Sequence, residues 1–211
     1  ALRQNVFYNE ATYDIQYGYL KRPTHANTSW DAAKFECCGQ RYVDLSDTQQ
    51  GIALLNDCKY GHNVIDNDMI MTLFRNTDNP SRFRDTGTHD FAYALLPHVG
   101  GLTAGRVAQQ GYLFNSPFLV FEGESSEAPL LSLSNEGMIV DCVKPAEDGS
   151  GDIILRLYEA VGGYSRAKLN FSHPVKALYD CNMLEEEQAK LDPAASIEFT
   201  PFKIRTLKVV Y

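Results

Sequence analysis

Residues 12–20 read TYDIQYGYL, and their side chains alternate between two kinds. Aromatic or aliphatic side chains occupy positions 13, 15, 17 and 19, and the positions between them carry threonine, aspartate, glutamine and glycine. A period of two places the two sets on opposite faces of an extended chain, which is typical of a half-buried β-strand. The stretch therefore predicts a strand over residues 12–20.

The same alternation recurs along the chain, at residues 90–95, 153–157, 197–199 and 207–211. Short apolar runs add GIALL (51–55), MIMTLF (69–74), PFLVF (117–121) and MIVDCV (138–143). Turn-forming residues separate these segments, as in DNPS (78–81), GG (100–101), EDGSGD (147–152) and GG (162–163). Many short strands with such punctuation predict an antiparallel all-β protein.

Helical signals are few. Residues 103–114 fit one helix with Thr103 as its cap, although two glycines weaken the pattern, and 183–191 (MLEEEQAKL) is acidic and helix-permissive. In THANTSWDAAKFE (24–36), Thr28 and Asp31 have the spacing of a capping box, which favours a helix start there.

The overall composition excludes several classes of protein. The chain has 211 residues, with 19 basic and 27 acidic side chains and a formal net charge of −8. This balance argues against binding to nucleic acid or to an anionic membrane surface. No stretch approaches the ~20 apolar residues of a membrane span. The chain starts at Ala1, so we expect an excised or processed piece, and its five cysteines without a C-x-x-C pair indicate reduced thiols and a cytoplasmic location.

Two stretches carry dense polar chemistry. RPTHANTSWD (22–31) has the composition of a sugar contact, because it combines the one tryptophan with amide and carboxylate groups. The alternative is a loop whose side chains bond its own backbone. LLNDCKYG (54–61) places an amide, an acid, a base and a phenol at a strand end, where they could reach a neighbouring pocket. The alternative is an ordinary hairpin turn.

Longer motifs then carry a family resemblance. ATYDIQYGYLKRPTHANTSWDAAKFE, YVDLSD and GIALLNDCKYGHNV occur in this order, followed by DTGTHDFAYALLPHVG, VDCVKPAEDGSGDIILRLYEA and PFKIRTLKV. Together they resemble the C-terminal region of the glycoside hydrolase family 38 α-mannosidases over essentially the whole chain. The resemblance implies a large antiparallel supersandwich, similar to that of galactose mutarotases and truncated here, over 1–148. A small immunoglobulin-like sandwich would follow over 149–211. It also implies a long loop, rather than a helix, at 22–36.

The resemblance implies a parent enzyme that is a retaining exo-α-mannosidase. Its nucleophile and its zinc ligands would lie in an N-terminal catalytic barrel, so this chain would carry no catalytic residue and no metal and would be inactive alone. The expected partners are that barrel and a mannose-containing oligosaccharide. A truncated sandwich would also expose an edge strand, from which we expect self-association.

By the same resemblance, the wall of the substrate pocket would include Asn56, Asp57, Lys59 and Tyr60, with Asp57 and Lys59 paired. The domain interface, or a secondary sugar contact, would include His25, Asn27, Trp30 and Asp31. The chain departs from the family at Gln40 and Tyr42, where histidine and tryptophan are common.

Two other functions remain open at this stage. One is a free-standing carbohydrate-binding module, for which the single tryptophan would have to provide the aromatic platform. The other is a complete small glycosidase that uses Asp57 as one of its two carboxylates.

Overall fold

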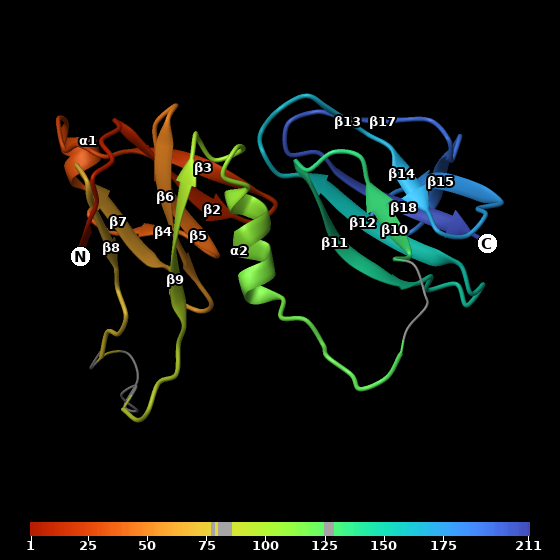
Figure 1. The fold of residues 1–211 in the computed structure, drawn as a ribbon, viewed down its shortest axis with the longest axis horizontal. Helices are drawn as coiled ribbons and strands as arrows, with labels where there is room; N and C mark the ends of the chain where they lie inside the picture. Colours follow the sequence, from red (N-terminus) through yellow and green to blue (C-terminus); the bar gives the residue numbers. More distant parts are fainter. Residues whose placement is uncertain (77–78, 80–85, 125–128) are drawn as a thin grey trace. The chain divides into compact units, whose positions relative to one another are not determined.

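The computed structural model describes residues 1–76, 79, 86–124 and 129–211, which form two compact units, 1–118 and 119–211. Antiparallel strands dominate both units, and the described residues contain two short helices (Figure 1). The predicted all-β class is therefore confirmed.

The first unit contains two antiparallel sheets. The larger has the order β3-β2-β5-β6-β9, with β3 at Gly18–Pro23, β2 at Glu10–Ile15, β5 at Tyr42–Ser46, β6 at Gln50–Asn56 and β9 at Tyr93–Val99. The smaller has the order β1-β8-β7-β4, with β1 at Leu2–Arg3, β8 at Asp68–Met71, β7 at Gly61–Ile65 and β4 at Cys37–Cys38.

The core of the first unit lies between these sheets. Tyr13, Val43 and Leu54 lie opposite one another across β2, β5 and β6, and all three are buried. They pack with Val64 of β7 and Met69 of β8. The period of two thus buries one face of the large sheet. On this face, burial raises the pKa of the Tyr13 phenol to about 12.

Helix α2 (Val107–Asn115) covers part of the opposite face of the large sheet, where it contacts β5 and β6. A Cβ atom on Gly111 would lie 2.8 Å from the Tyr42 ring, so this glycine permits the close approach. The helix begins later than the predicted 103–114. Arg106 stands at its N-cap in the left-handed region (φ 51°), without a side-chain cap, and Thr103 lies in the preceding turn.

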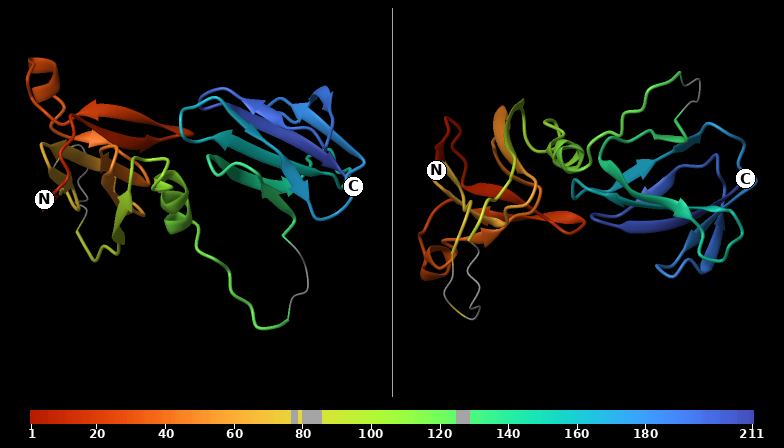
Figure 2. Two further views of the ribbon diagram at one scale, coloured as in Figure 1. Left: turned by 45° about the horizontal axis from the view of Figure 1, so that its top comes forward. Right: turned by 90° about the horizontal axis from the view of Figure 1, so that it is seen from below.

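The second unit is built on the five-stranded sheet β11-β12-β18-β15-β16. These strands span Met138–Pro145, Ile153–Glu159, Ile204–Val210, Ala177–Cys181 and Glu187–Leu191 in that order. Two small pairs accompany it, β10 (Leu131–Leu133) with β14 (Leu169–Phe171), and β13 (Ser165–Ala167) with β17 (Ile197–Phe199). Leu155 and Leu207 of the large sheet pack with Leu169 and Phe199 of the small pairs, and together they form the core of this unit. Figure 2 shows the strands of the unit from two further sides.

Several segments differ from the sequence predictions. Residues 12–20 form a hairpin rather than one strand, because the chain turns at Tyr17 (φ 55°) and β3 pairs back on β2. Residues 187–191, predicted as helix-permissive, form edge strand β16 beside β15. PFLVF forms no strand, and Phe118 to Phe121 are each more than 80% exposed.

The expected domain boundary at 148/149 also differs from the division at 118/119. The EDGSGD segment is the loop of a hairpin, since β11 and β12 pair from Met138 opposite Glu159 to Pro145 opposite Ile153. Its acidic, glycine-rich composition therefore marks a tight turn within one unit.

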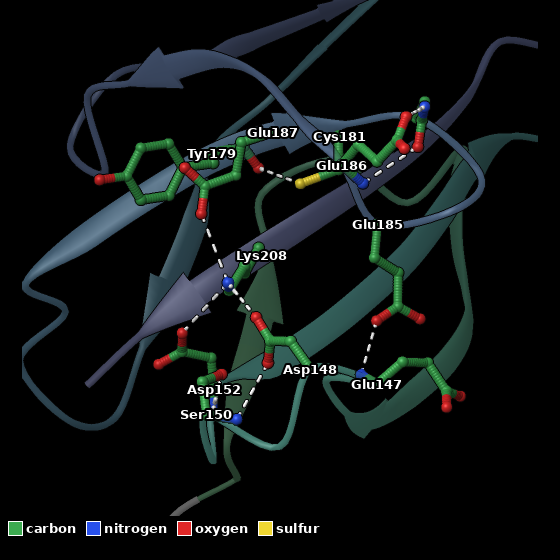
Figure 3. Close-up of polar contacts among 11 residues, drawn as sticks. Glu147, Asp148, Ser150, Asp152, Tyr179, Cys181, Glu185, Glu186, Glu187 and Lys208 are labelled. Atoms are coloured by element: carbon green, nitrogen blue, oxygen red, sulfur yellow. Dashed lines mark hydrogen bonds and ion pairs between the residues drawn. The ribbon is translucent and has the colours of Figure 1, made fainter.

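That hairpin loop takes part in an ionic network on the second unit, drawn in Figure 3. The Lys208 ammonium lies 2.8 Å from Asp148, 3.3 Å from Glu187 and 3.5 Å from Asp152. The Asp148 carboxylate raises the pKa of Lys208, and the ammonium holds the pKa of Asp148 well below its usual range. One cation thus ties the 147–152 loop to strands β16 and β18.

Candidate functional site

The tip at the end of β6, residues 56–61, is anchored by one buried amide. The Asn56 side chain is 1% exposed. Its Nδ2 donates to the Gln40 carbonyl at 2.6 Å, and its Oδ1 accepts from the Lys59 backbone N–H at 2.6 Å. Asn115 of α2 donates to the Asn56 carbonyl at 3.0 Å. The tip is therefore fixed from both sides, because its anchor, the last residue of β6, bonds to the 40–41 segment and to α2.

His62 completes the anchor, and sequence reasoning did not identify it. Its Nε2 lies 3.0 Å from the Lys59 carbonyl oxygen, so this nitrogen carries a proton and donates. Burial lowers the pKa of His62, which keeps the ring neutral near pH 7. The residue stands at an inward position of β7, opposite Cys37 of β4. Its alternation with Val64 in GHNVI was the available sequence signal.

The side chains beyond the anchor face solvent. Asp57 is exposed, and Tyr60 is 58% exposed. Asp57 Oδ2 accepts from the Ala92 N–H at 2.9 Å, while the Lys59 ammonium lies 4.8 Å from the centroid of the Phe91 ring. The two side chains thus contact different neighbours instead of forming the expected ion pair. The Cys58 thiol and the Ala92 N–H lower the pKa of Asp57, which is ionised at pH 7.

The second predicted cluster lies on and before helix α1 (Ser29–Ala32). Thr28 and Asp31 form the capping box: the Asp31 N–H donates to Thr28 Oγ1 at 3.1 Å, and that hydroxyl donates to Asp31 Oδ2 at 2.7 Å. His25 Nδ1 lies 3.7 Å from Asp31 Oδ2 and accepts from the Asn27 N–H at 3.4 Å. The long loop expected at 22–36 leads into β4 (Cys37–Cys38), and it contains one short helix because the cap starts α1 there.

Trp30, on the same helix, is 79% exposed. The polar groups of the loop mostly satisfy one another, as the alternative interpretation of the loop predicts. Among the residues that the structure describes, no hydrogen bond or ion pair joins this cluster to the tip. The structure therefore does not bring the two predicted groups into one constellation.

The two departures from the family have structural roles. Gln40 supplies the carbonyl that receives the Asn56 amide, a contact that any residue could make through its backbone. Tyr42 is 1% exposed and lies under Gly111 of α2. Gln40 thus bonds to the anchor of the tip, and Tyr42 packs against α2, which also bonds to that anchor.

The side chains of the tip offer hydrogen-bond donors and acceptors to the solvent. The tip presents a carboxylate, an ammonium and a phenol on a rigid loop, groups that exchange hydrogen bonds with sugar hydroxyls. Within the described ranges, no three His, Cys, Asp or Glu side chains are placed to hold a metal ion. No helix among those residues has the length and apolar character to cross a bilayer.

Comparisons with known proteins identify the family of both units. Residues 4–83 match the glycosyl hydrolases family 38 C-terminal domain, and residues 137–207 match the glycosyl hydrolases family 38 C-terminal beta sandwich domain. The chain is 37% identical over 213 residues to alpha-mannosidase G of Dictyostelium discoideum and 39% identical over 218 residues to human alpha-mannosidase 2C1. These alignments cover 95% and 96% of this chain, and 20% of each relative.

The fold agrees with these matches. The crystal structure of an alpha-mannosidase from Enterococcus faecalis superposes with a TM-score of 0.77 at 20% identity, over 98% of this chain and 25% of the other. The chain thus spans about a fifth to a quarter of the length of the proteins that it matches. Because both family models match in order and together span most of the sequence, the chain belongs to the C-terminal domains of glycosyl hydrolase family 38.

Proposed function

We propose that this chain is the C-terminal β region of a retaining exo-α-mannosidase and that its tip, residues 56–61, walls the substrate pocket. The observation that carries the proposal is the contrast within the tip. Asn56 is buried and hydrogen-bonded on both sides, while Asp57 and Tyr60 next to it are exposed without a core to pack against. A rigid loop that presents polar side chains outward is built to meet another surface.

In this proposal the tip binds and orients the sugar, and it carries no bond-breaking group. The ionised Asp57 carboxylate accepts from a sugar hydroxyl, and the Tyr60 phenol donates to or accepts from another. Retention of configuration needs two carboxyl groups about 5 Å apart, one as nucleophile and one as acid and base. We assign both to the part of the enzyme outside this chain, because the tip supplies one carboxylate.

We also place the zinc of such an enzyme outside this chain. When bound, the ion polarises adjacent sugar hydroxyls. The acidic network on the second unit does not fit it, because the Lys208 ammonium lies among the carboxylates of Asp148, Asp152 and Glu187. The five free cysteines favour a reducing compartment, so we propose a cytoplasmic enzyme.

A non-catalytic carbohydrate-binding module is the second candidate. The observation in its favour is the exposure of two neighbouring aromatic side chains, Trp30 at 79% and Phe35 at 73%. Exposed aromatic rings stack on the apolar face of a sugar.

Assay with an aryl α-mannoside tests the proposed parent activity and the inactivity of the isolated chain. The complete protein that contains this sequence should release the aryl group, and the 211-residue chain alone should not, with or without added zinc. Turnover by the isolated chain that is lost in Asp57→Asn would establish a small glycosidase instead. Failure of the complete protein to cleave any α-mannoside would contradict the proposed parent activity.

A further inference from the structure

A cleft of about 400 Å³ lies on the first unit, away from the tip. Its lining includes Tyr8, Glu10, Tyr19, Lys21 and the two turns at 46–48 and 101–104. Strand β6 runs from the cleft end of the sheet to the tip, since Asp47 bonds to Gln50 at its start and Asn56 ends it. At ~3.3 Å per residue, the two places lie about 20 Å apart. The cleft is thus a second, separate feature of this unit.

The strand register explains why the cleft is polar. Thr12 lies opposite Lys21, and Asp14 lies opposite Tyr19, so these side chains share one face of the β2-β3 hairpin. The alternate residues, such as Tyr13, face the core. Helix α2 covers the neighbouring part of this polar face over β5 and β6 and leaves the part over the hairpin open. An open strip of a half-covered sheet face therefore forms the floor of the cleft.

The back wall of the cleft is held rigidly. Ser46 donates to Asp44 Oδ2 at 2.7 Å, and His98 Nε2 lies 2.8 Å from Asp44 Oδ1. A Cβ atom on Gly105 would come within 2.4 Å of His98 Nδ1, so the chain packs directly on the ring. The bond to Asp44, which His98 also contacts, fixes the Ser46 side chain, as a preformed binding site requires.

The charged groups of the cleft are also positioned. Asp47 Oδ1 accepts the backbone N–H groups of Gln49 and Gln50 at 2.6 and 2.8 Å, which orients its carboxylate. Lys21 lies 3.6 Å from Glu10 Oε2. Two acids and one base line the space, together with two phenol rings. This balance disfavours an anion such as phosphate, because the carboxylates would repel it.

We propose that the cleft binds a neutral saccharide ring. Carboxylates accept from sugar hydroxyls, an ammonium donates to them, and phenol rings cover the apolar C–H surface. The cavity volume is within the range of small-molecule sites. The choice of a mannoside as ligand rests on the proposed function, whereas the cleft chemistry itself calls for a neutral polyhydroxylated ring.

The test is a titration of the ¹⁵N-labelled 211-residue chain with mannose and with mannobiose, followed by amide chemical shifts. We expect saturable shifts at Thr48, Gly101 and Thr103 and none with inorganic phosphate. In Gly101→Leu the new side chain projects into the cleft, and its Cβ meets the Asp47 carbonyl at an ordinary 3.6 Å. This variant should raise the dissociation constant at least about tenfold. Gly163→Leu is the matched control, since nothing lies within 4 Å of its Cβ position, and it should bind like the parent chain.

A second variant keeps the test decisive if Gly101→Leu unfolds. Lys21→Met removes the ammonium of an exposed side chain and should weaken binding without loss of the folded amide spectrum. Shifts confined to Trp30 and its neighbours, shifts confined to the tip, or no saturable shift at all would each overturn the proposal. These readouts measure equilibrium binding by this chain, so they are independent of whether the complete protein cleaves mannosides.

Discussion

The Nε2 atom of His98 lies 2.8 Å from Oδ1 of Asp44, and their side chains are 5% and 0% exposed. The two residues are 54 positions apart in sequence and meet because β6 pairs with both β5 and β9. The carboxylate raises the pKa of His98, so the protonated ring is the form that the fold stabilises. This ion pair joins the edge strand to the centre of the sheet.

The pair makes the stability of the first unit depend on pH. Because the pKa of His98 is raised in the folded state, its contribution is fully present below the ordinary histidine pKa of about 6.5 and is lost as the pH rises through the folded value. His98→Gln should lower the free energy of unfolding by about 3 kcal/mol in mild acid, because it removes the charged partner of the buried Asp44 carboxylate. Denaturant unfolding at several pH values measures this difference, which should shrink as the pH increases.

The control for this experiment is His173→Gln, which changes an exposed histidine. It should leave the unfolding curve unchanged at every pH. If the loss in the free energy of unfolding caused by His98→Gln grew toward alkaline pH, its pH dependence would be opposite to that expected for the ion pair.

Asn56→Ala should loosen the tip. The substitution removes the acceptor of the Lys59 N–H and the donor to the Gln40 carbonyl, so two partly buried backbone groups lose their partner. We expect a loss of about 1–3 kcal/mol in the free energy of unfolding. Faster hydrogen exchange at the Lys59 amide would localise the effect. Asn27→Ala, at an exposed position, should change neither quantity, and equal effects of the two variants would argue against a special anchor.

The second unit should respond to acid through the Lys208 network. The lowered pKa of Asp148 means that its contribution is present above the ordinary aspartate pKa of about 3.9 and is lost as the pH falls. Lys208→Met should therefore lower the melting temperature at neutral pH, and the difference from the parent chain should narrow in strong acid. Lys168→Met, an exposed control, should have little effect. A difference that stays constant down to strong acid would show that the lost contact is not ionic.

Trp30→Ala tests the carbohydrate-binding alternative. The side chain is 79% exposed, so the substitution should change the free energy of unfolding by less than about 0.5 kcal/mol. Isothermal titration with mannobiose should give the same affinity for this variant and for the parent chain. Loss of sugar binding in Trp30→Ala would support a binding module built on this loop.

The parts of the fold that follow from local pattern could be predicted from the sequence. The alternation at 153–157 and 207–211 identifies β12 and β18, and the Thr28–Asp31 spacing identifies the start of α1. In TYDIQYGYL the pattern predicted extended chain correctly but not the turn at Tyr17, because a tyrosine with positive φ carries no sequence signal. The boundary expected at 148/149 falls inside the acidic turn at 147–152, because turns and domain linkers share their composition.

The candidate sites depend on contacts between distant residues, and these could not be predicted from local pattern. The resemblance pointed to Asn56 and its neighbours, but the roles of His62 and Asn115 in holding the tip appear only when β7 and α2 are placed. The polar cleft arises from the register of β2 and β3 and from the limited reach of α2. Neither the strand register nor the reach of α2 can be predicted from a short sequence motif.

Enzyme kinetics of the complete protein test whether the tip walls the pocket of an α-mannosidase. In the complete protein, kcat/KM for an aryl α-mannoside should be compared between the natural sequence, Asp57→Asn with Tyr60→Ala, and the control Tyr164→Ala, whose side chain is 85% exposed on the second unit. We predict that the double variant lowers kcat/KM by at least about tenfold with unchanged folding, while the control keeps its activity. Unchanged kcat/KM in the folded double variant would show that the tip does not line the pocket.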